Sequence, residues 1–369
     1  MYSQNDLDEA VAAGAISAES AAALRNFIEI QSSESAVDEE QFRLITGFND
    51  IFVSIAAVIL LVAVGWIGQW VGTMAGTAVE GDGPSFLAPA AVAATSWGLA
   101  LFFTARRRMA LPSILLLLAF VGSVFASVAL ALILAIGTGQ LDNNPQLAGL
   151  LAAVAGAVAA GAAWLHWNRF RVPITVAAGA AAVSSIAIGL LLAALGENFE
   201  QARNLVLGFV LLLGVGVFLL AMRWDSSDPG RVTRRSDVAF WLHLLAAPMI
   251  VHPIFTLLGL NDGTATIGEG LVVVLLYVLM GLAALAIDRR ALLVSALAYV
   301  LFALNELFKQ FGAIELNVAL TALIIGSALL LLSAFWHQAR QAVVKPLPDG
   351  LKARLPVLDR AAAVSRQAA

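Results

Sequence analysis

The sequence predicts an all-α protein, a polytopic bundle of transmembrane helices, and three observations support this. Apolar residues make up 60% of the 369-residue chain, against ~45–50% in typical soluble domains. Charged residues make up only 12%, against ~25%, and the mean hydropathy is +0.89. Long apolar runs also alternate with short polar separators. A soluble globule would have to place this apolar excess on its surface, so we predict a membrane protein.

Composition also excludes several kinds of chemistry. The chain contains no cysteine, which rules out disulfides, thiolate metal sites and cysteine nucleophiles. The formal net charge of −4 is not the footprint of a nucleic-acid-binding protein. We therefore expect no cofactor, no metal and no nucleic-acid partner.

Residues 1–48 are polar and acidic, and they predict a small cytoplasmic helical module rather than a signal peptide. A short helix is expected over residues 7–13, with Gly14 at its end because glycine takes the left-handed C′ position at low cost. Ser17 can cap a second helix that runs to about Ile30. The resulting hairpin could dock a protein partner, or it could be a solvated tail that orients membrane insertion.

The predicted transmembrane bundle covers residues 49–336. A spanning helix needs ~20 mostly apolar residues, at ~1.5 Å rise each, to cross ~30 Å of hydrocarbon. Reading for such runs predicts about ten spans, at 51–71, 86–104, 111–136, 147–167, 172–195, 205–222, 238–260, 271–287, 291–311 and 313–335. Almost no loop separates the last two ranges, so a re-entrant pair is an alternative there.

Basic and acidic separators alternate along the chain, which predicts the orientation of the bundle. With the N-terminus in the cytoplasm, 19 of the 21 Lys and Arg fall on the cytoplasmic side, and only Arg203 and Lys309 do not. The positive-inside rule then places both termini in the cytoplasm. Residues 337–369 form a basic cytoplasmic tail, in which three prolines forbid one long helix.

Two stretches resemble a known family. These are Ala-Gly-Ala-Ile-Ser-Ala-Glu-Ser-Ala at 13–21 and Gln-Phe-Arg-Leu-Ile-Thr-Gly-Phe-Asn-Asp-Ile-Phe-Val at 41–53, and the turn Asp288-Arg289-Arg290-Ala291 is also similar. Together they resemble the DUF2157-type bacterial multi-pass membrane proteins, mainly over residues 1–75. The resemblance implies the bacterial cytoplasmic (inner) membrane, and it carries no established chemistry.

The ninth predicted span carries polar residues at membrane depth, namely Asn305, Glu306 and Lys309. Glu306 lies 15 residues beyond Ala291, or ~22 Å deep, and His252 in the seventh span lies at nearly the same depth. Ionisable groups at such depth usually face the bundle interior or a water-filled cavity. We therefore predict a polar membrane site between spans seven, nine and ten, made by these four residues. The alternative is an interfacial pair that snorkels to water.

A second candidate pair is His243 in the seventh span and Glu315 in the tenth. His243 and His252 are nine residues apart, which places them on opposite faces of a straight helix and argues against a shared metal. Pro248 between them could kink the helix. His166 lies near a predicted cytoplasmic helix end beside tryptophans and is expected to anchor that end at the interface.

Gly68, Gly72 and Gly76 are spaced by four at the outer end of the first predicted span, which permits close helix contact within the protein or in a homo-oligomer. No P-loop, dinucleotide fingerprint, zinc-protease or nucleophile-elbow motif is present. An enzyme is therefore unsupported.

Two functions follow from these features. The first is a scaffold or sensor with a cytoplasmic docking hairpin, which is favoured because only Glu306 and Lys309 are expected to lie clearly inside the bundle. The second is a small-solute or ion transporter that uses the polar site and a kinked seventh helix. Besides the lipid bilayer, the expected partners are a protein at the N-terminal hairpin and a second copy of the chain.

Overall fold

The computed structural model divides into two units, one of residues 1–42 with 357–369 and one of residues 43–356. The residues that it describes are 11, 13–14, 16–24, 48–199, 201–229, 231, 233–258, 267–290, 292–293, 297, 301, 317–352 and 355–358.

In the N-terminal unit the described residues show two local features that the sequence predicts. Gly14 has a positive φ of 68°, and its N–H donates to the carbonyl of Val11. The hydroxyl of Ser17 accepts from the N–H of Ser20 at 3.0 Å, where a helical stretch starts at residue 18. The rest of the predicted hairpin lies outside the described residues, so the hairpin as a whole stays a prediction.

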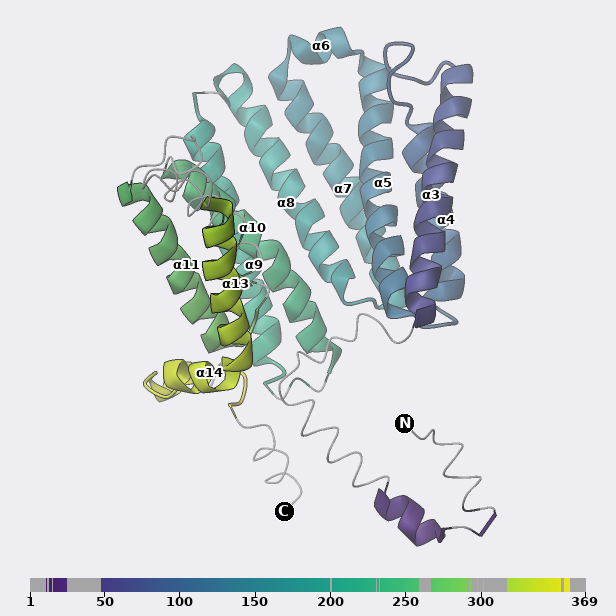
Figure 1. The fold of residues 1–369 in the computed structure, drawn as a ribbon. Coiled ribbons are helices and arrows are strands. Elements are labelled where there is room, and N and C mark those ends of the chain that lie inside the picture. The colour runs from purple at the N-terminus through teal and green to yellow at the C-terminus, as the bar shows by residue number, and fades with distance from the viewer. Residues whose placement is uncertain are drawn as a thin grey trace. The chain divides into compact units, whose positions relative to one another are not determined.

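The larger unit is built of helices that run side by side (Figure 1). Its long helices are α3 (Phe48–Met74), α4 (Leu87–Phe103), α5 (Ala110–Ile136), α7 (Pro145–Phe170), α8 (Ile174–Leu195), α9 (Arg203–Ser226), α10 (Arg234–Leu257), α11 (Ile267–Ile287) and α13 (Asn317–Ala334). Shorter elements are α6 (Thr138–Asp142), the 3₁₀ helix η2 (Gly196–Phe199), α14 (Trp336–Val344) and α15 (Asp349–Lys352). The described residues contain no strand, which agrees with the predicted all-α class.

Six helices in the described ranges are long and apolar enough to cross a membrane, namely α3, α5, α7, α8, α9 and α10. The helix α4 is shorter, and α13 bends by 77° into α14. Described helices overlap nine of the ten predicted spans, and the remaining range, 291–311, lies mostly outside the described residues. The number of ten spans stays a prediction.

Glycines allow the closest helix contacts in the bundle. A Cβ placed on Gly149 of α7 would lie 2.6 Å from the carbonyl oxygen of Gly189 in α8, and one on Gly189 would lie 2.7 Å from that of Gly149. Side chains larger than hydrogen would push the two backbones apart at these positions. In the same way Gly68 of α3 packs against the carbonyl of Leu87 at the start of α4. This part of the predicted glycine stripe therefore packs within the chain.

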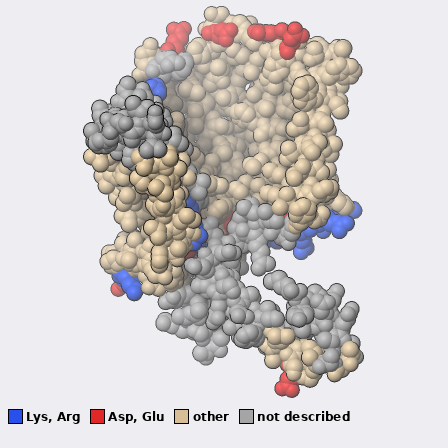
Figure 2. Space-filling model, in the orientation of Figure 1, with Lys and Arg blue, Asp and Glu red and all other residues tan. Residues whose placement is uncertain are grey.

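Charge separates the two ends of the helical unit (Figure 2). We call one end the acidic end, because the connections between the long helices there, including the short helices α6 and η2, carry Glu80, Asp82, Asp142 and Glu197. The opposite end carries the turns at 104–109, 171–173, 227–233 and 288–290, and we call it the basic end. In Figure 2 the acidic end is at the top and most of the visible Lys and Arg lie toward the bottom.

Much of the side surface between the two ends is apolar. On α3 alone the exposed side chains include Phe52, Ile59, Trp66 and Trp70, each more than 60% exposed. Soluble monomers rarely expose contiguous apolar patches beyond a few hundred Å². This surface suits contact with lipid chains.

Candidate functional site

Three charged or titratable side chains meet in the interior at the basic end. Asp225 stands in the last turn of α9, His243 in the third turn of α10, and Arg289 follows the end of α11. Their exposed fractions are only 1%, 0% and 2%. We call them, together with Ser236, the Asp225 network.

The carboxylate of Asp225 is the centre of this network. Arg289 donates to it twice, from Nη2 to Oδ1 at 2.5 Å and from Nε to Oδ2 at 3.2 Å. On the other side, Nε2 of His243 lies 3.0 Å from Oδ2. Nη2 of Arg289 also donates to the carbonyl oxygen of Ser236 at 3.0 Å. Two-point contacts between Arg and carboxylate are among the stronger hydrogen bonds and fix geometry as well as charge.

The connection between α9 and α10 positions these side chains. Asp228 accepts from the N–H and the hydroxyl of Thr233, at 2.9 and 2.6 Å, which closes the loop. Thr233 in turn caps α10 by accepting from the N–H of Arg235. Farther along, Gly214 lets α9 approach the backbone of Met249 in α10, since a Cβ there would lie 2.9 Å away. The two helices are thus held close enough for Asp225 to reach His243.

A second group of polar side chains surrounds Asp288, the neighbour of Arg289, and we call it the Asp288 network. Its carboxylate accepts from Nη1 of Arg231 at 2.9 Å and from Nε1 of Trp336 at 2.8 Å. Arg340 of α14 lies 3.7 Å away. Arg231 also donates to the carbonyl oxygens of Ile287 and Asp288. The two networks therefore join α9, α10, the end of α11 and α14.

This arrangement is suited to holding helices together rather than to catalysis. The Asp225 network contains no thiol, and its one hydroxyl, that of Ser236, lies 3.4 Å from Nη2 of Arg289, so the polar atoms of the network bond mainly to one another. Two open hollows between helices, of about 540 and 280 Å³, lie elsewhere, between α3, α4 and α5 and between α5, α7 and α8, and apolar side chains line most of both. Within the described ranges, no group of three or more His, Asp or Glu side chains is placed to hold a metal ion.

The structure separates the two histidines of α10, as their spacing predicts. His243 is buried and packs against Phe218 at 5.2 Å between ring centres, whereas His252 is exposed. The other predicted members of the polar membrane site, Asn305, Glu306 and Lys309, lie outside the described residues. Glu315, the predicted partner of His243, also lies outside them. The partner that the structure gives His243 is Asp225.

Two findings about charge and burial go beyond what hydropathy shows. Asp225, Arg231 and Arg289 lie in polar separators between the predicted spans, yet each is at most 4% exposed. Hydropathy could not reveal this, because Asp225 and Arg289 are 64 residues apart and become paired only when α9, α10 and α11 pack together. The cue that the sequence did offer was mixed charge, since the separator at 223–237 carries three Asp beside four Arg.

His166 is the second finding, and it corrects an expectation. Instead of anchoring a helix end at an interface, it is fully buried, and its Nδ1 lies 3.2 Å from the hydroxyl of Thr175 in α8. Aromatic rings from three helices surround it, Trp97 of α4, Phe120 of α5 and Phe170 of α7. Its sequence neighbour Trp164 is 64% exposed, so position near a helix end was a poor guide to burial.

The fold and the site define an all-helical bundle whose several long apolar helices are compatible with an integral membrane protein. No protein-family model, no curated protein and no solved structure matches the chain.

Proposed function

We propose that the chain is a multi-pass protein of the bacterial cytoplasmic membrane, with both termini in the cytoplasm, that acts as a scaffold or sensor. The distribution of charge supports the orientation, since Lys and Arg concentrate at one end of the bundle and the positive-inside rule assigns that end to the cytoplasm. The exposed apolar surface of α3 and its neighbours supports the location. The relationship to DUF2157-type proteins, proposed from residues 1–75, agrees with both.

The Asp225 network is the observation that carries the choice of a scaffold or sensor. A transport site needs polar groups that exchange partners with a solute or with water. The buried charges of the Asp225 and Asp288 networks instead engage one another and join four segments at the basic end. The result is a firmly connected cytoplasmic face, to which the N-terminal helical hairpin would bring a protein partner.

The test compares the size of native complexes. The full chain and a variant that lacks residues 1–46 are extracted from their own membranes in a mild detergent and sized by native electrophoresis. We expect the variant to stay inserted in the membrane but to migrate as a smaller complex, by more than the mass removed. An unchanged complex would contradict a docking role for the hairpin.

A small-solute or ion transporter remains the second candidate, because one observation favours it. Pro248 and Pro253 both lie inside α10, and the exposed His252 stands between them. Prolines interrupt backbone hydrogen bonds, as in the discontinuous helices of transporters. Proteoliposomes under an imposed pH gradient separate the candidates, since a flux that His252→Ala abolishes would support transport and a flux equal to that of empty liposomes would support the scaffold.

A further inference from the structure

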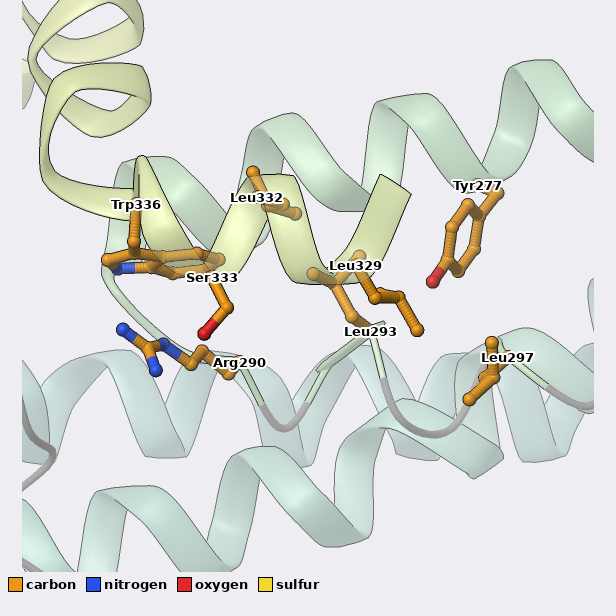
Figure 3. A pocket seen from close by; sticks show the side chains of 8 residues that line it. All are labelled: Tyr277, Arg290, Leu293, Leu297, Leu329, Leu332, Ser333 and Trp336. Carbon is orange, nitrogen blue, oxygen red and sulfur yellow. The ribbon is translucent and has the colours of Figure 1, made fainter. Parts of the chain in front are cut away.

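A small cavity of about 120 Å³ lies at the basic end, between α11, the residues that follow it and α13 (Figure 3). Most of its wall is apolar, with leucines from α13 and from the segment after α11. Figure 3 shows the Arg290 side chain beneath the Trp336 ring at one end of this row of leucines, with Ser333 beside them. Tyr277 lies at the other end.

The polar groups of the cavity are placed at its two ends. The guanidinium carbon of Arg290 lies 4.8 Å from the centre of the Trp336 ring, a cation–π distance that holds the charge beside the cavity. At the other end, the hydroxyl of Tyr277 is buried and has no hydrogen-bond partner among the described residues. The wall between the two ends presents almost only apolar surface, so the charge of a ligand would lie at the Arg290 end and its apolar part along the leucines.

Next to this cavity, the negative charge of the Asp288 carboxylate is already paired with Arg231. Asp288 accepts from Arg231 and from Nε1 of Trp336, so the same indole that stacks on Arg290 is fixed from its other edge. The Asp288 carboxylate therefore repels an anion near Arg290 less strongly, because it already accepts from these two donors. The local charge favours a negatively charged headgroup.

We propose that this cavity binds an anionic phospholipid, with its phosphate on Arg290 and part of one acyl chain among Leu293, Leu297 and Leu329. The apolar wall of the cavity suits part of one acyl chain. Basic pockets between helices on the cytoplasmic side suit anionic lipid headgroups, and Trp at the interface suits their depth. The proposal rests on the membrane location and orientation proposed above.

Lipid binding to the purified full-length protein tests the proposal. Native mass spectrometry from detergent micelles measures the affinity for phosphatidylglycerol and for phosphatidylcholine with the same acyl chains. We expect tighter binding of phosphatidylglycerol, and Arg290→Gln should weaken it about tenfold, or ~1.4 kcal/mol. Arg107→Gln is the matched control, because Arg107 also lies at the basic end over an aromatic ring, Phe102 at 5.5 Å, but lines no part of this cavity.

A second variant keeps the test decisive if Arg290→Gln does not fold. Leu329→Phe fills the cavity while leaving Arg290 and Trp336 in place, and Leu331→Phe adds the same bulk on an exposed face of α13. We expect only Leu329→Phe to weaken lipid binding. Equal affinity for the two lipids, or equal effects of the paired variants, would overturn the proposal. Because complex size and membrane insertion are measured separately, this failure would be distinct from failure of the scaffold role.

Discussion

Asp225 is buried at the end of an apolar helix because Arg289 and His243 face its carboxylate. The desolvation of a lone buried charge costs several kcal/mol, and the bidentate guanidinium offsets it. Replacing a whole buried ion pair by apolar residues is often harmless, whereas removing one partner leaves the other charge uncompensated. The network therefore predicts strongly non-additive effects of substitution.

The first prediction concerns this pair. Asp225→Asn leaves Arg289 without its counter-charge and should lower the free energy of unfolding by about 3–5 kcal/mol. The double variant Asp225→Leu with Arg289→Met should recover much of that loss. Thermal and chemical unfolding of the purified protein in detergent measure both effects. The control is Asp82→Asn, at an exposed position of the acidic end. If the unfolding midpoint of Asp225→Asn were no lower than that of this control, Asp225 would not be a buried partner of Arg289.

The second prediction concerns His166, whose ring fills a space between aromatic side chains of three helices. His166→Ala should cost about 3 kcal/mol through the cavity that it leaves. His166→Phe should cost much less, because it keeps the ring. Trp164→Ala removes a larger aromatic side chain from the exposed face of the same helix and should cost less than His166→Ala. Unfolding midpoints in detergent rank the three variants, and a cost for Trp164→Ala equal to that of His166→Ala would contradict the burial.

At the scale of helices, α7 and α8 depend on the backbone contact at Gly149 and Gly189. The third prediction is that Gly149→Ala destabilises by about 1–3 kcal/mol, because its Cβ would meet backbone atoms of Gly189 and Ala193. Gly161→Ala in the same helix has open space around it and should be neutral or stabilising, since Ala favours helix by up to ~1 kcal/mol over Gly. Thermal unfolding of the two variants side by side is the measurement. Equal midpoints would argue against the close contact.

Helix positions were largely predictable from hydropathy, whereas helix ends were not. The seventh predicted span begins at residue 238, but α10 begins at Arg234, because Thr233 caps it and a helix continues through polar residues once it is nucleated. Likewise α9 runs to Ser226, four residues past the predicted end at 222, and Asp225 lies in that extension. Hydropathy ends a span where apolar residues end, so it left the central residue of the candidate site in a loop.

At the scale of the molecule, the separation of charge predicts its orientation, and the absence of native cysteine makes the fourth prediction direct to test. A membrane-impermeant maleimide added to spheroplasts should label Asp142→Cys at the acidic end but not Ser227→Cys at the basic end. Both positions are exposed. After permeabilisation both should react, which controls for reactivity. The reverse pattern would invert the proposed topology.

The candidate site was less predictable than the bundle, because its chemistry depends on residues that are distant in sequence. The sequence places Arg289 in a basic turn, but no local pattern shows that its side chain points inward to Asp225. Nor does any local pattern show that the Asp288 carboxylate lies near Arg231, Trp336 and Arg340. The depth argument for His252 identified the more exposed of the two histidines in α10. Hydrophobic periodicity finds helices, but pairing between helices is a tertiary property.

The separation of 64 positions between Asp225 and Arg289 also sets an order of events during synthesis. At about 5–20 residues per second, a ribosome needs roughly 3–13 s to extend the nascent chain from the carboxylate to its guanidinium. Throughout that interval Asp225 lacks Arg289 as a partner. Because burying a lone carboxylate is costly, we expect the hairpin of α9 and α10 to keep Asp225 near the aqueous surface. The carboxylate can be buried with its partner only after α11 and Arg289 have been synthesised. Burial of the end of α9 therefore depends on a later part of the chain. A nascent chain arrested before residue 289 should therefore remain open to proteases at the cytoplasmic end of α9.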